Sequence, residues 1–516
     1  MAIKIKPIKS FLVLVISLSS GVQVFSQQWL GSAISNYGGT NAAYTNPASL
    51  GGNEYKMYVN GVGLGLNIIN DYISWGAPFT VSDYMNDKVP AQYKDSTGAV
   101  QFRPEWLKEN LNGKSKNFYV EAELRGPAFM YRLNEKMAVA FSMKNRTGIT
   151  FTNVDQSMAR IAIHGIDSSN GNVLFTPPNN LSFGQPLGNL TFNMNALSYQ
   201  EFALSFGTEV IEVKSFKIKA GVSAKLLVGN ANAYAQVNDM DLQISGFDSL
   251  RVNNADFAYG YNNPDIVSNF NAKDLLPSFS SNLGFAWDAG VMVEYSPKVA
   301  NNLTSKKTNY LFKAGLSLVD MGSISFKKNT KAFTVKSKAP FTFVRDSTTD
   351  AATEDGITSD KAVEYYDSIA NVYFNIAQQN PLVYHLPSML SLQFDFNIFK
   401  SFFLGAIVYQ DIRGIKFDKI TLHRPSQITI LPRFEHKHIE VAIPITLGGD
   451  YKDFQVGGFV RVGPVFVGSD NLKSIITQKD FYGVNTYFGF AKGIGANKKK
   501  KTDVISASIV LPVGLY

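Results

Sequence analysis

The feature that most constrains this chain is an alternation of apolar and polar side chains from Asn117 to Tyr131, NFYVEAELRGPAFMY. Its odd positions carry the charged residues Glu121, Glu123 and Arg125. Its even positions are the apolar residues Phe118, Val120, Ala122, Leu124, Ala128 and Met130. A period of two is the pattern of a β-strand with one apolar and one wet face. The strand belongs either to a soluble sandwich or to a membrane barrel, in which lipid-facing and lumen-facing residues alternate.

Residues 1–26 are predicted to be a cleaved signal peptide. Lys4, Lys6 and Lys9 precede an apolar run from Phe11 to Leu18, and small or polar residues follow. This order of basic, apolar and small residues directs export. Cleavage before Gln27 is expected to start the mature chain there. An exported chain with many alternating strands favours the membrane barrel over the sandwich.

Composition narrows the class further. The chain has no cysteine, which rules out disulfides, thiolate metal sites and a lipid-anchored N-terminal cysteine. After the signal there is no apolar run of about eighteen residues, so a helical membrane protein is not expected. The formal net charge of +8, minus the three signal lysines, is +5, and Lys498–Lys501 supply four of those charges. Because the excess is local, no nucleic-acid binding is predicted.

Fourteen segments have the pattern of strands, and a barrel with both chain ends on one side needs an even number. They lie near residues 54–69, 117–131, 137–151, 198–211, 216–230, 281–296, 309–326, 388–398, 402–413, 425–434, 438–448, 453–467, 483–492 and 503–515. The segment 425–434 contains two prolines and is ambiguous alone. The last segment ends in the aromatic Tyr516, as assembly signals of membrane barrels do. The expected fold is all-β, a transmembrane β-barrel of about 14 antiparallel strands over residues 54–516.

This strand count places short turns and long loops at opposite ends of the barrel. The short turns lie around Asn134, Lys214, Lys400 and Lys437. The long segments are 70–116, 152–197, 231–280 and 327–387. Short periplasmic turns and long outer loops are the usual arrangement. Lys498–Lys501 then fall in the last outer loop, where they are expected to meet the phosphates of lipopolysaccharide or to form a solvated turn.

The segment before the first strand carries a family resemblance. Residues 27–53 are rich in Gly, Ser and Asn and contain Asn46-Pro47-Ala48. Further matches are LGFAWDAGVMVEYSP, AGLSLVDMGSISF, the LPSMLSLQFDF hairpin and GPVFVGSDNL, which begin at Leu283, Ala314, Leu386 and Gly463. The chain resembles the FadL-like outer-membrane barrels of Gram-negative envelopes, including the PorV-like members that accompany type IX secretion. The resemblance implies 14 strands and an N-terminal segment folded into the lumen as a hatch, with Asn46, Pro47 and Ala48 at its centre.

Two helices are predicted in the outer loops. One runs from Pro104 to Leu111, with proline at the first helical position. The other runs from Ser359 to Gln379, and its helically spaced residues include Tyr366, Ile369, Tyr373 and Ile376. The second helix is expected to pack its apolar side on the barrel mouth, or else to bind a partner.

Charged residues are predicted to line the lumen as a ladder on paired strands. The turn after Leu133 places Glu123 opposite Arg146 and Arg125 near Lys144, with Glu121 on the same face. The next hairpin places Glu209 across from Lys219. Paired opposite charges stiffen a plugged lumen, whereas separated ones line a water channel. The structural ladder is the favoured interpretation.

No enzyme, cofactor or metal site is predicted. His436 and His438 lie two apart beside Glu435 and Glu440, which is compatible with a metal but better explained by a solvated turn. The sequence contains no Gly-x-Ser-x-Gly elbow, phosphate loop or HExxH motif.

Two functions remain open. In the favoured one, the barrel is a structural component that holds protein partners of an envelope secretion or assembly complex, as the PorV-like resemblance implies. In the alternative, it is a FadL-like channel for hydrophobic small molecules. The charged lumen favours the first, because sites for apolar ligands are mostly apolar.

Overall fold

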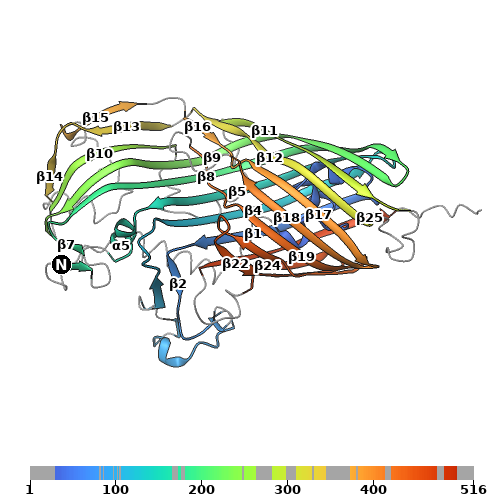
Figure 1. Ribbon diagram of the computed structural model, residues 1–516, viewed down its shortest axis with the longest axis horizontal. Helices are drawn as coiled ribbons and strands as arrows, with labels where there is room; N and C mark the ends of the chain where they lie inside the picture. The colour runs from blue at the N-terminus through green and yellow to red at the C-terminus, as the bar shows by residue number, and fades with distance from the viewer. Residues whose placement is uncertain are drawn as a thin grey trace, which may run out of the picture.

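A computed structural model of the chain describes most residues between Trp29 and Ala496. The described ranges are 29–80, 83–84, 86–96, 98–100, 103, 106–164, 173–175, 181–246, 249–262, 282–297, 310–327, 330–344, 372–378, 382–412, 420–472 and 482–496. Figure 1 shows an all-β protein in which tilted antiparallel strands close into a barrel. The predicted signal peptide and the segment 497–516, with Lys498–Lys501, lie outside the described residues.

The barrel has 14 strands, as the sequence predicts. In chain order they are β1 (Tyr55–Asn70), β4 (Lys116–Arg132), β5 (Met137–Val154), β8 (Pro186–Val213), β9 (Phe216–Ile244), β11 (Asn282–Tyr295), β12 (Phe312–Phe326), β17 (Met389–Phe399), β18 (Phe402–Asp411), β19 (Gln427–Glu435), β20 with β21 (Ile439–Ala442, Ile445–Gly448), β22 with β23 (Asp453–Val456, Gly458–Val462), β24 (Val465–Asn471) and β25 (Gly483–Ala496). Antiparallel pairing of β1 with β25 closes the ring, from Tyr55↔Ala496 to Ile69↔Gly483.

One detail of the predicted strand list is wrong. The segment 453–467 is not one strand, because the chain turns at Gly463 and β23 pairs with β24 from Val462↔Val465 onward. Gly463 has a φ of 58° and makes that reversal possible. Among the described residues, β25 pairs with β1 and closes the ring, and it ends at Ala496 opposite Tyr55. The predicted strand 503–515 and Lys498–Lys501 lie outside the described residues.

Most short turns lie at one end of the barrel and most long connections at the other. Short turns follow β4, β8, β17, β19 and β23 at the first end. The long connections after β1, β5, β9 and β12, together with the short turn after β21, lie at the second end. We call these the short-turn end and the long-loop end. In membrane barrels the short-turn end faces the periplasm.

The exterior of the barrel is apolar, as a bilayer requires. Exposed large apolar side chains occur on nearly every barrel strand, among them Phe129, Phe141, Leu204, Val222, Phe285, Leu316, Phe394, Leu404, Ile430, Val441, Val460, Val467 and Phe490. Within the described ranges, no helix is long and apolar enough to cross a membrane.

A bulge reverses the faces of β4 halfway along its length. The pairing of β4 with β5 shifts register between Arg125 and Ala128. Met130 is consequently fully buried, whereas Phe129 is 39% exposed on the exterior. The prediction that Ala128 and Met130 share the outer face with Phe118 is therefore wrong, because simple alternation does not include the extra residue of a bulge.

The sheet continues far beyond the barrel at the long-loop end (Figure 1). Strands β8 and β9 have 28 and 29 residues, whereas about 9–11 span a bilayer. The extension also contains β10 (Ser249–Tyr261), β13 (Lys331–Ser337), β14 (Phe341–Val344), β15 (Phe374–Gln378) and β16 (Leu382–His385). Much of the predicted loops 231–280 and 327–387 is thus sheet.

The remaining elements are short. Strands β2 (Ile73–Trp75) and β3 (Leu107–Glu109) pair, as do β6 (Val173–Phe175) and β7 (Leu181–Ser182), and η2 (Ala91–Tyr93) and α5 (Gln156–His164) lie in the same outer connections. The predicted helix over Pro104–Leu111 is wrong, because Leu107 pairs with Trp75 in a β-ladder. Residues 29–52, called the hatch, form α2 (Leu30–Ala33), α3 (Thr40–Ala43) and η1 (Pro47–Leu50).

Candidate functional site

The hatch lies inside the barrel near its short-turn end. Gly52 N–H donates to the Lys136 carbonyl in the turn between β4 and β5, at 3.1 Å. Trp29, Leu30 and Leu50 of the hatch are at most 1% exposed. The predicted segment 27–53 is thus placed, over its described residues, within the lumen.

Glycines of the wall make room for the backbone of η1. A Cβ at Gly221 on β9 would lie 2.3 Å from the carbonyl carbon of Pro47. A Cβ at Gly207 on β8 would lie 2.7 Å from the Cβ of Leu50. Both distances are below any normal contact, so only glycine allows the chain to lie this close. Ala48, between them in η1, is fully buried.

Asn46 lies against two further wall glycines, Gly290 on β11 and Gly315 on β12. We call Gly207, Gly221, Gly290 and Gly315 the glycine seat. The Asn46 Oδ1 accepts the Ala48 N–H at 3.0 Å and so caps η1, while its Nδ2 donates to the Val291 carbonyl at 3.2 Å and the Leu316 carbonyl at 3.5 Å. A Cβ at Gly290 would lie 2.2 Å from Asn46 Oδ1. Gly315 gives similar room, with its Cβ position 2.9 Å from Asn46 Nδ2. The Asn-Pro-Ala motif therefore docks on four neighbouring strands.

The other side of the hatch packs on an aromatic wall. The Trp29 ring is stacked with Tyr487 of β25 at 5.9 Å between centroids and lies 5.3 Å from Phe466 of β24. The Gly31 N–H donates to the Tyr487 hydroxyl at 3.0 Å. The Arg125 guanidinium lies over Trp29 at 3.7 Å, a cation–π contact. The wall residues in this apolar cluster are Tyr55, Tyr58, Met130, Met389, Ile407, Tyr409, Leu431, Phe459, Phe466 and Tyr487.

The β4–β5 part of the predicted charge ladder lies on the lumen face of these two strands. Glu123 is opposite Arg146 in the β4–β5 register, and Arg125 is opposite Lys144. Arg125 and Lys144 do not form an ion pair with the residue opposite them. Arg125 pairs with Glu123 of its own strand, and Lys144 pairs with Glu201 at 3.0 Å.

Arg146 is the centre of this network. Its guanidinium lies 2.8 Å from Asp320, 3.2 Å from Glu121 and 3.4 Å from Glu123. Lys225 joins the same group, at 2.6 Å from Asp320 and 2.7 Å from Asp288. The network has five acids and five bases: Glu121, Glu123, Glu201, Asp288 and Asp320 with Arg125, Lys144, Arg146, Lys225 and Arg424. Its formal charge is balanced.

Sequence reasoning missed Asp320 and Arg424. The pairing of β12 with β11 shifts register between Trp287 and Ala289, and Asp320 has a φ of 59°. This bulge turns Asp320 into the lumen, where strict alternation from Lys313 would direct it outward. Arg424 lies in a connection between strands, where a period of two gives no signal.

The second predicted pair differs in the same way. Glu209 is opposite Lys219 in register, but its ion pair is with Lys217 at 3.1 Å, and Lys219 pairs with Glu294 of β11 at 2.6 Å. A third group, missed in part, fixes the hatch: Arg433 lies 2.6 Å from both Asp395 and Glu435, and Glu435 accepts the side-chain amide of Asn36 at 2.8 Å. The acids near His436 and His438 are thus engaged, since Glu440 pairs with Arg461 at 3.0 Å.

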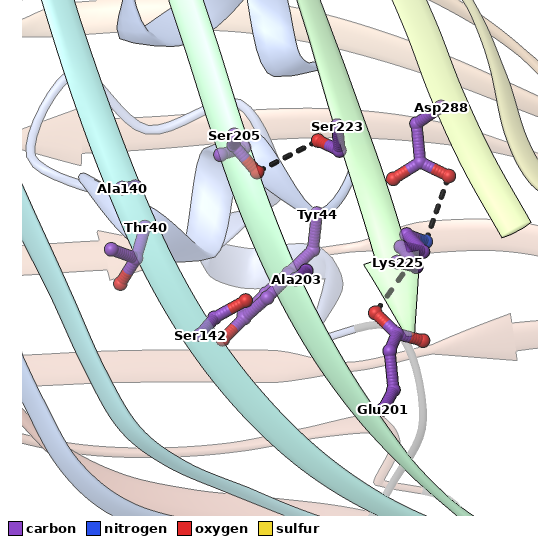
Figure 2. A pocket seen from close by; sticks show the side chains of 11 residues that line it. Thr40, Tyr44, Ala140, Ser142, Glu201, Ala203, Ser205, Ser223, Lys225 and Asp288 are labelled. Atoms are coloured by element: carbon purple, nitrogen blue, oxygen red, sulfur yellow. Dashed lines mark hydrogen bonds and ion pairs between the residues drawn. The ribbon is translucent and has the colours of Figure 1, made fainter. Parts of the chain in front are cut away.

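A small cavity separates the hatch from the wall (Figure 2). Its volume of about 10 Å³ suits roughly one water molecule. In Figure 2 Tyr44 of the hatch faces Ser142 and Ala203, and Lys225 lies between Glu201 and Asp288. A larger solute cannot occupy this cavity while the hatch is seated.

The predicted loop helix does not end as expected. Tyr366 and Ile369 lie outside the described residues. Ile376 lies in β15 and pairs with Val335 of β13, so the prediction of a helix through Gln379 is wrong over Phe374–Gln378. Tyr373 stacks on Phe341 at 4.4 Å between centroids. Residues Phe374–Gln378 pair with β13 of the extension, and the helical spacing of their own sequence does not reveal this partner strand.

Comparisons with known proteins place the chain in a family. Two mutant forms of the TodX monoaromatic hydrocarbon channel, with 10% and 9% sequence identity, align with 89% of this chain and 95% of theirs at a TM-score of 0.36. No curated protein matches the sequence. The family described as "Family of unknown function (DUF5723)" matches residues 47–470, which is most of the chain. The protein therefore belongs to the DUF5723 family.

Proposed function

We propose that this protein is a non-enzymatic outer-membrane channel for small apolar molecules and that the hatch is its gate. The observation that carries the proposal is the glycine seat. Four neighbouring strands present glycines where the hatch backbone or the Asn46 side chain lies, so the hatch fills this part of the lumen and wall side chains do not. A barrel of this size leaves an open lumen unless something fills it. Departure of the hatch would therefore clear this part of the lumen.

The wall that the hatch covers suggests the chemistry of the solute. Trp29, Leu30 and Ile34 pack against aromatic and aliphatic residues of the wall, among them Phe459 and Phe466. Sites for small apolar ligands are lined by such residues with a few polar groups. An apolar solute is expected to occupy the space that Trp29 and Leu30 leave.

This proposal reverses the preference drawn from the sequence. The sequence alone predicts that the charges leave little apolar wall, but Glu123, Arg146 and Asp320 pair within their own network. The aromatic residues lie on other strands, with Phe459 on β23 and Phe466 on β24. The central network and these aromatic residues therefore lie on different strands, and they meet at Arg125, whose guanidinium lies 3.7 Å from the Trp29 ring.

The test is uptake of a labelled apolar solute by cells or vesicles that carry an Asn46→Ala variant. Loss of Asn46 removes the cap of η1 and both bonds to the wall, so the hatch should leave its seat more often and uptake should rise. Asn134→Ala, in an exposed turn, is the control. Uptake equal to that of cells without the protein, in both variants, would contradict a channel.

A second candidate is the partner-holding component. The observation that favours it is the extension, where Phe257, Phe374 and Phe341 form a partly exposed aromatic row. Such rows occur at protein interfaces. Mild detergent extraction followed by mass spectrometry should then find partners that are lost with Phe257→Ser and Phe374→Ser. A solitary barrel whose uptake depends on Asn46 would exclude this candidate.

A further inference from the structure

The lumen has a second covering near the long-loop end, made by residues 420–426 between β18 and β19. We call this segment the strap. Counted along the ring of strands, β19 lies seven strands from β5, which is the opposite side of the barrel. Yet Leu422 contacts β5, where a Cβ at Gly148 would lie 2.8 Å from Leu422 Cδ1. The strap therefore crosses the lumen.

Contacts along the strap fix it to three other parts of the wall. The Ile420 carbonyl accepts the His385 N–H at 2.9 Å. Arg424 lies 3.2 Å from Glu121 and 3.4 Å from Asp320, so it covers the central charge network. Leu422 is 6% exposed. A solute that passes through the lumen must displace these residues as well as the hatch.

His423 bonds the strap to the end of β18 and to the turn after β21. Its Nδ1 lies 2.9 Å from an Asp411 carboxylate oxygen at the end of β18, and its Nε2 lies 2.9 Å from an Asp450 carboxylate oxygen in the turn after β21. A ring that bonds two carboxylates donates from both nitrogens, which only the protonated form can do. Asp450 also accepts the Ser426 N–H at 2.9 Å, and the Asp411 N–H donates to Ser426 Oγ at 3.0 Å.

We propose that the strap is a gate at the long-loop end of the lumen and that His423, bonded to Asp411 and Asp450, is the latch that holds it closed. The latch loses one of its two bonds when His423 loses its proton, which weakens the closure, while the contacts of Ile420, Arg424 and Ser426 remain. The gate rests on the proposed function only because a gate presupposes a passage. The test below measures the position of the strap and not transport, so the two can fail separately.

The surroundings of His423 determine the pH at which the latch opens. Burial lowers its pKa, but the hydrogen bonds and charges of Asp411 and Asp450 raise it more, to about 9. The other groups beside it are the Tyr119 ring of β4, at 5.4 Å between centroids, and Arg424, whose guanidinium is turned to Glu121. Because the pKa is raised above the ordinary value, the stabilisation is complete below about pH 6.5 and is lost as the pH rises through about 9.

The experiment uses the full chain in detergent, with one engineered cysteine at Thr421→Cys. The natural chain has no cysteine, and Thr421 is 7% exposed, so the rate of reaction with a maleimide reports opening of the strap. Each rate is divided by that of a Glu135→Cys chain, in an exposed turn, because the thiolate fraction itself rises with pH. Folding of each variant is checked by its heat-dependent gel mobility.

At pH 7 the corrected rate should rise roughly tenfold or more with His423→Gln, since a lost charged hydrogen bond shifts a local opening equilibrium by about that factor. His436→Gln, in an exposed turn at the other end of the barrel, is the matched control and should change nothing. With the natural histidine the corrected rate should climb as the pH passes about 9, and with glutamine it should stay level.

Equal corrected rates at pH 7 with and without the His423→Gln change, or a pH-dependent rise that persists with glutamine, would overturn the latch. Asp450→Asn gives a second route if the glutamine chain does not fold. It leaves the histidine in place but removes one carboxylate, so the rise should move to lower pH. An unchanged midpoint would count against the proposal as well.

Discussion

Arg146 on β5 and Asp320 on β12 meet at 2.8 Å inside the lumen, although 174 residues separate them in the chain. Three barrel strands, β8, β9 and β11, lie between their own strands in the wall. Both side chains are almost fully buried, at 4% and 1% exposure. The pair therefore braces the barrel across its interior, and its removal should affect the whole barrel.

Arg146→Met should lower the free energy of unfolding by about 3–5 kcal/mol, because it leaves buried carboxylates without their partner. Urea unfolding of the barrel in lipid vesicles measures this value. Arg251→Met, which removes an exposed arginine of the extension, should cost less than about 0.5 kcal/mol. A double-mutant cycle with Asp320→Asn should show strong coupling, and additive losses would mean that the two residues do not interact.

Gly221→Ala should displace the hatch without opening the barrel wall. The new methyl group would lie 2.3 Å from the Pro47 carbonyl carbon, and the hatch backbone cannot yield by a side-chain rotation. The readout is maleimide labelling of a Ser32→Cys chain, whose residue 32 is 5% exposed when the hatch is seated. Gly61→Ala, with ordinary space of 3.6 Å to Phe490, should leave labelling slow. Slow labelling in both chains would argue against the glycine seat.

The two ends of the barrel should differ in access from outside the cell. An epitope inserted at Asp87 or at Ala339, both in long-loop connections with exposed backbone turns, should bind antibody on intact cells. An epitope at Asn134 should bind only after the outer membrane is opened. The reverse pattern would place the hatch on the outside and invert the orientation.

Phe466→Leu should lower the initial rate of uptake of an aromatic solute at low solute concentration by roughly three- to tenfold, because it removes part of the apolar wall that the hatch covers. Phe394→Leu is the matched control, since Phe394 is 58% exposed on the exterior of the barrel. The measurement compares concentration dependences of uptake for the two variants. If both change equally, Phe466 has no special contact with the solute.

The fold could be predicted because apolar and polar side chains alternate along the wall strands, where one face meets lipid and the other meets the lumen. Alternation fails where a strand contains an extra residue, at Arg125–Ala128 and beside Asp320, since a bulge reverses the phase. Alternation alone also reads β23 and β24 as one strand, because only two residues, Gly463 and Pro464, separate two strands of the same pattern.

The site could be predicted only in part. Glu123 and Arg146 share a hairpin, so their opposition follows from the turn alone. The contacts of Arg146 with Asp320, and of Asn46 with Val291 and Leu316, join distant segments and depend on closure of the barrel. The strap lies between strands, and no periodicity marks His423 as a residue that bonds Asp411.

The most direct measurement of the central claim is uptake by a barrel whose hatch can be locked and released. In an Asn41→Cys/Asn60→Cys chain the cysteines replace two side chains that hydrogen-bond between the hatch and β1, with Asn60 Nδ2 3.0 Å from Asn41 Oδ1, so oxidation can join hatch and wall without adding a Cβ to the glycine seat. The natural chain has no cysteine, so a reductant acts on this bond alone, and Asn60→Cys is the control. A gating hatch predicts no uptake of an apolar solute in the oxidised chain and uptake after reduction; equal uptake in both states, with the disulfide verified, would contradict it.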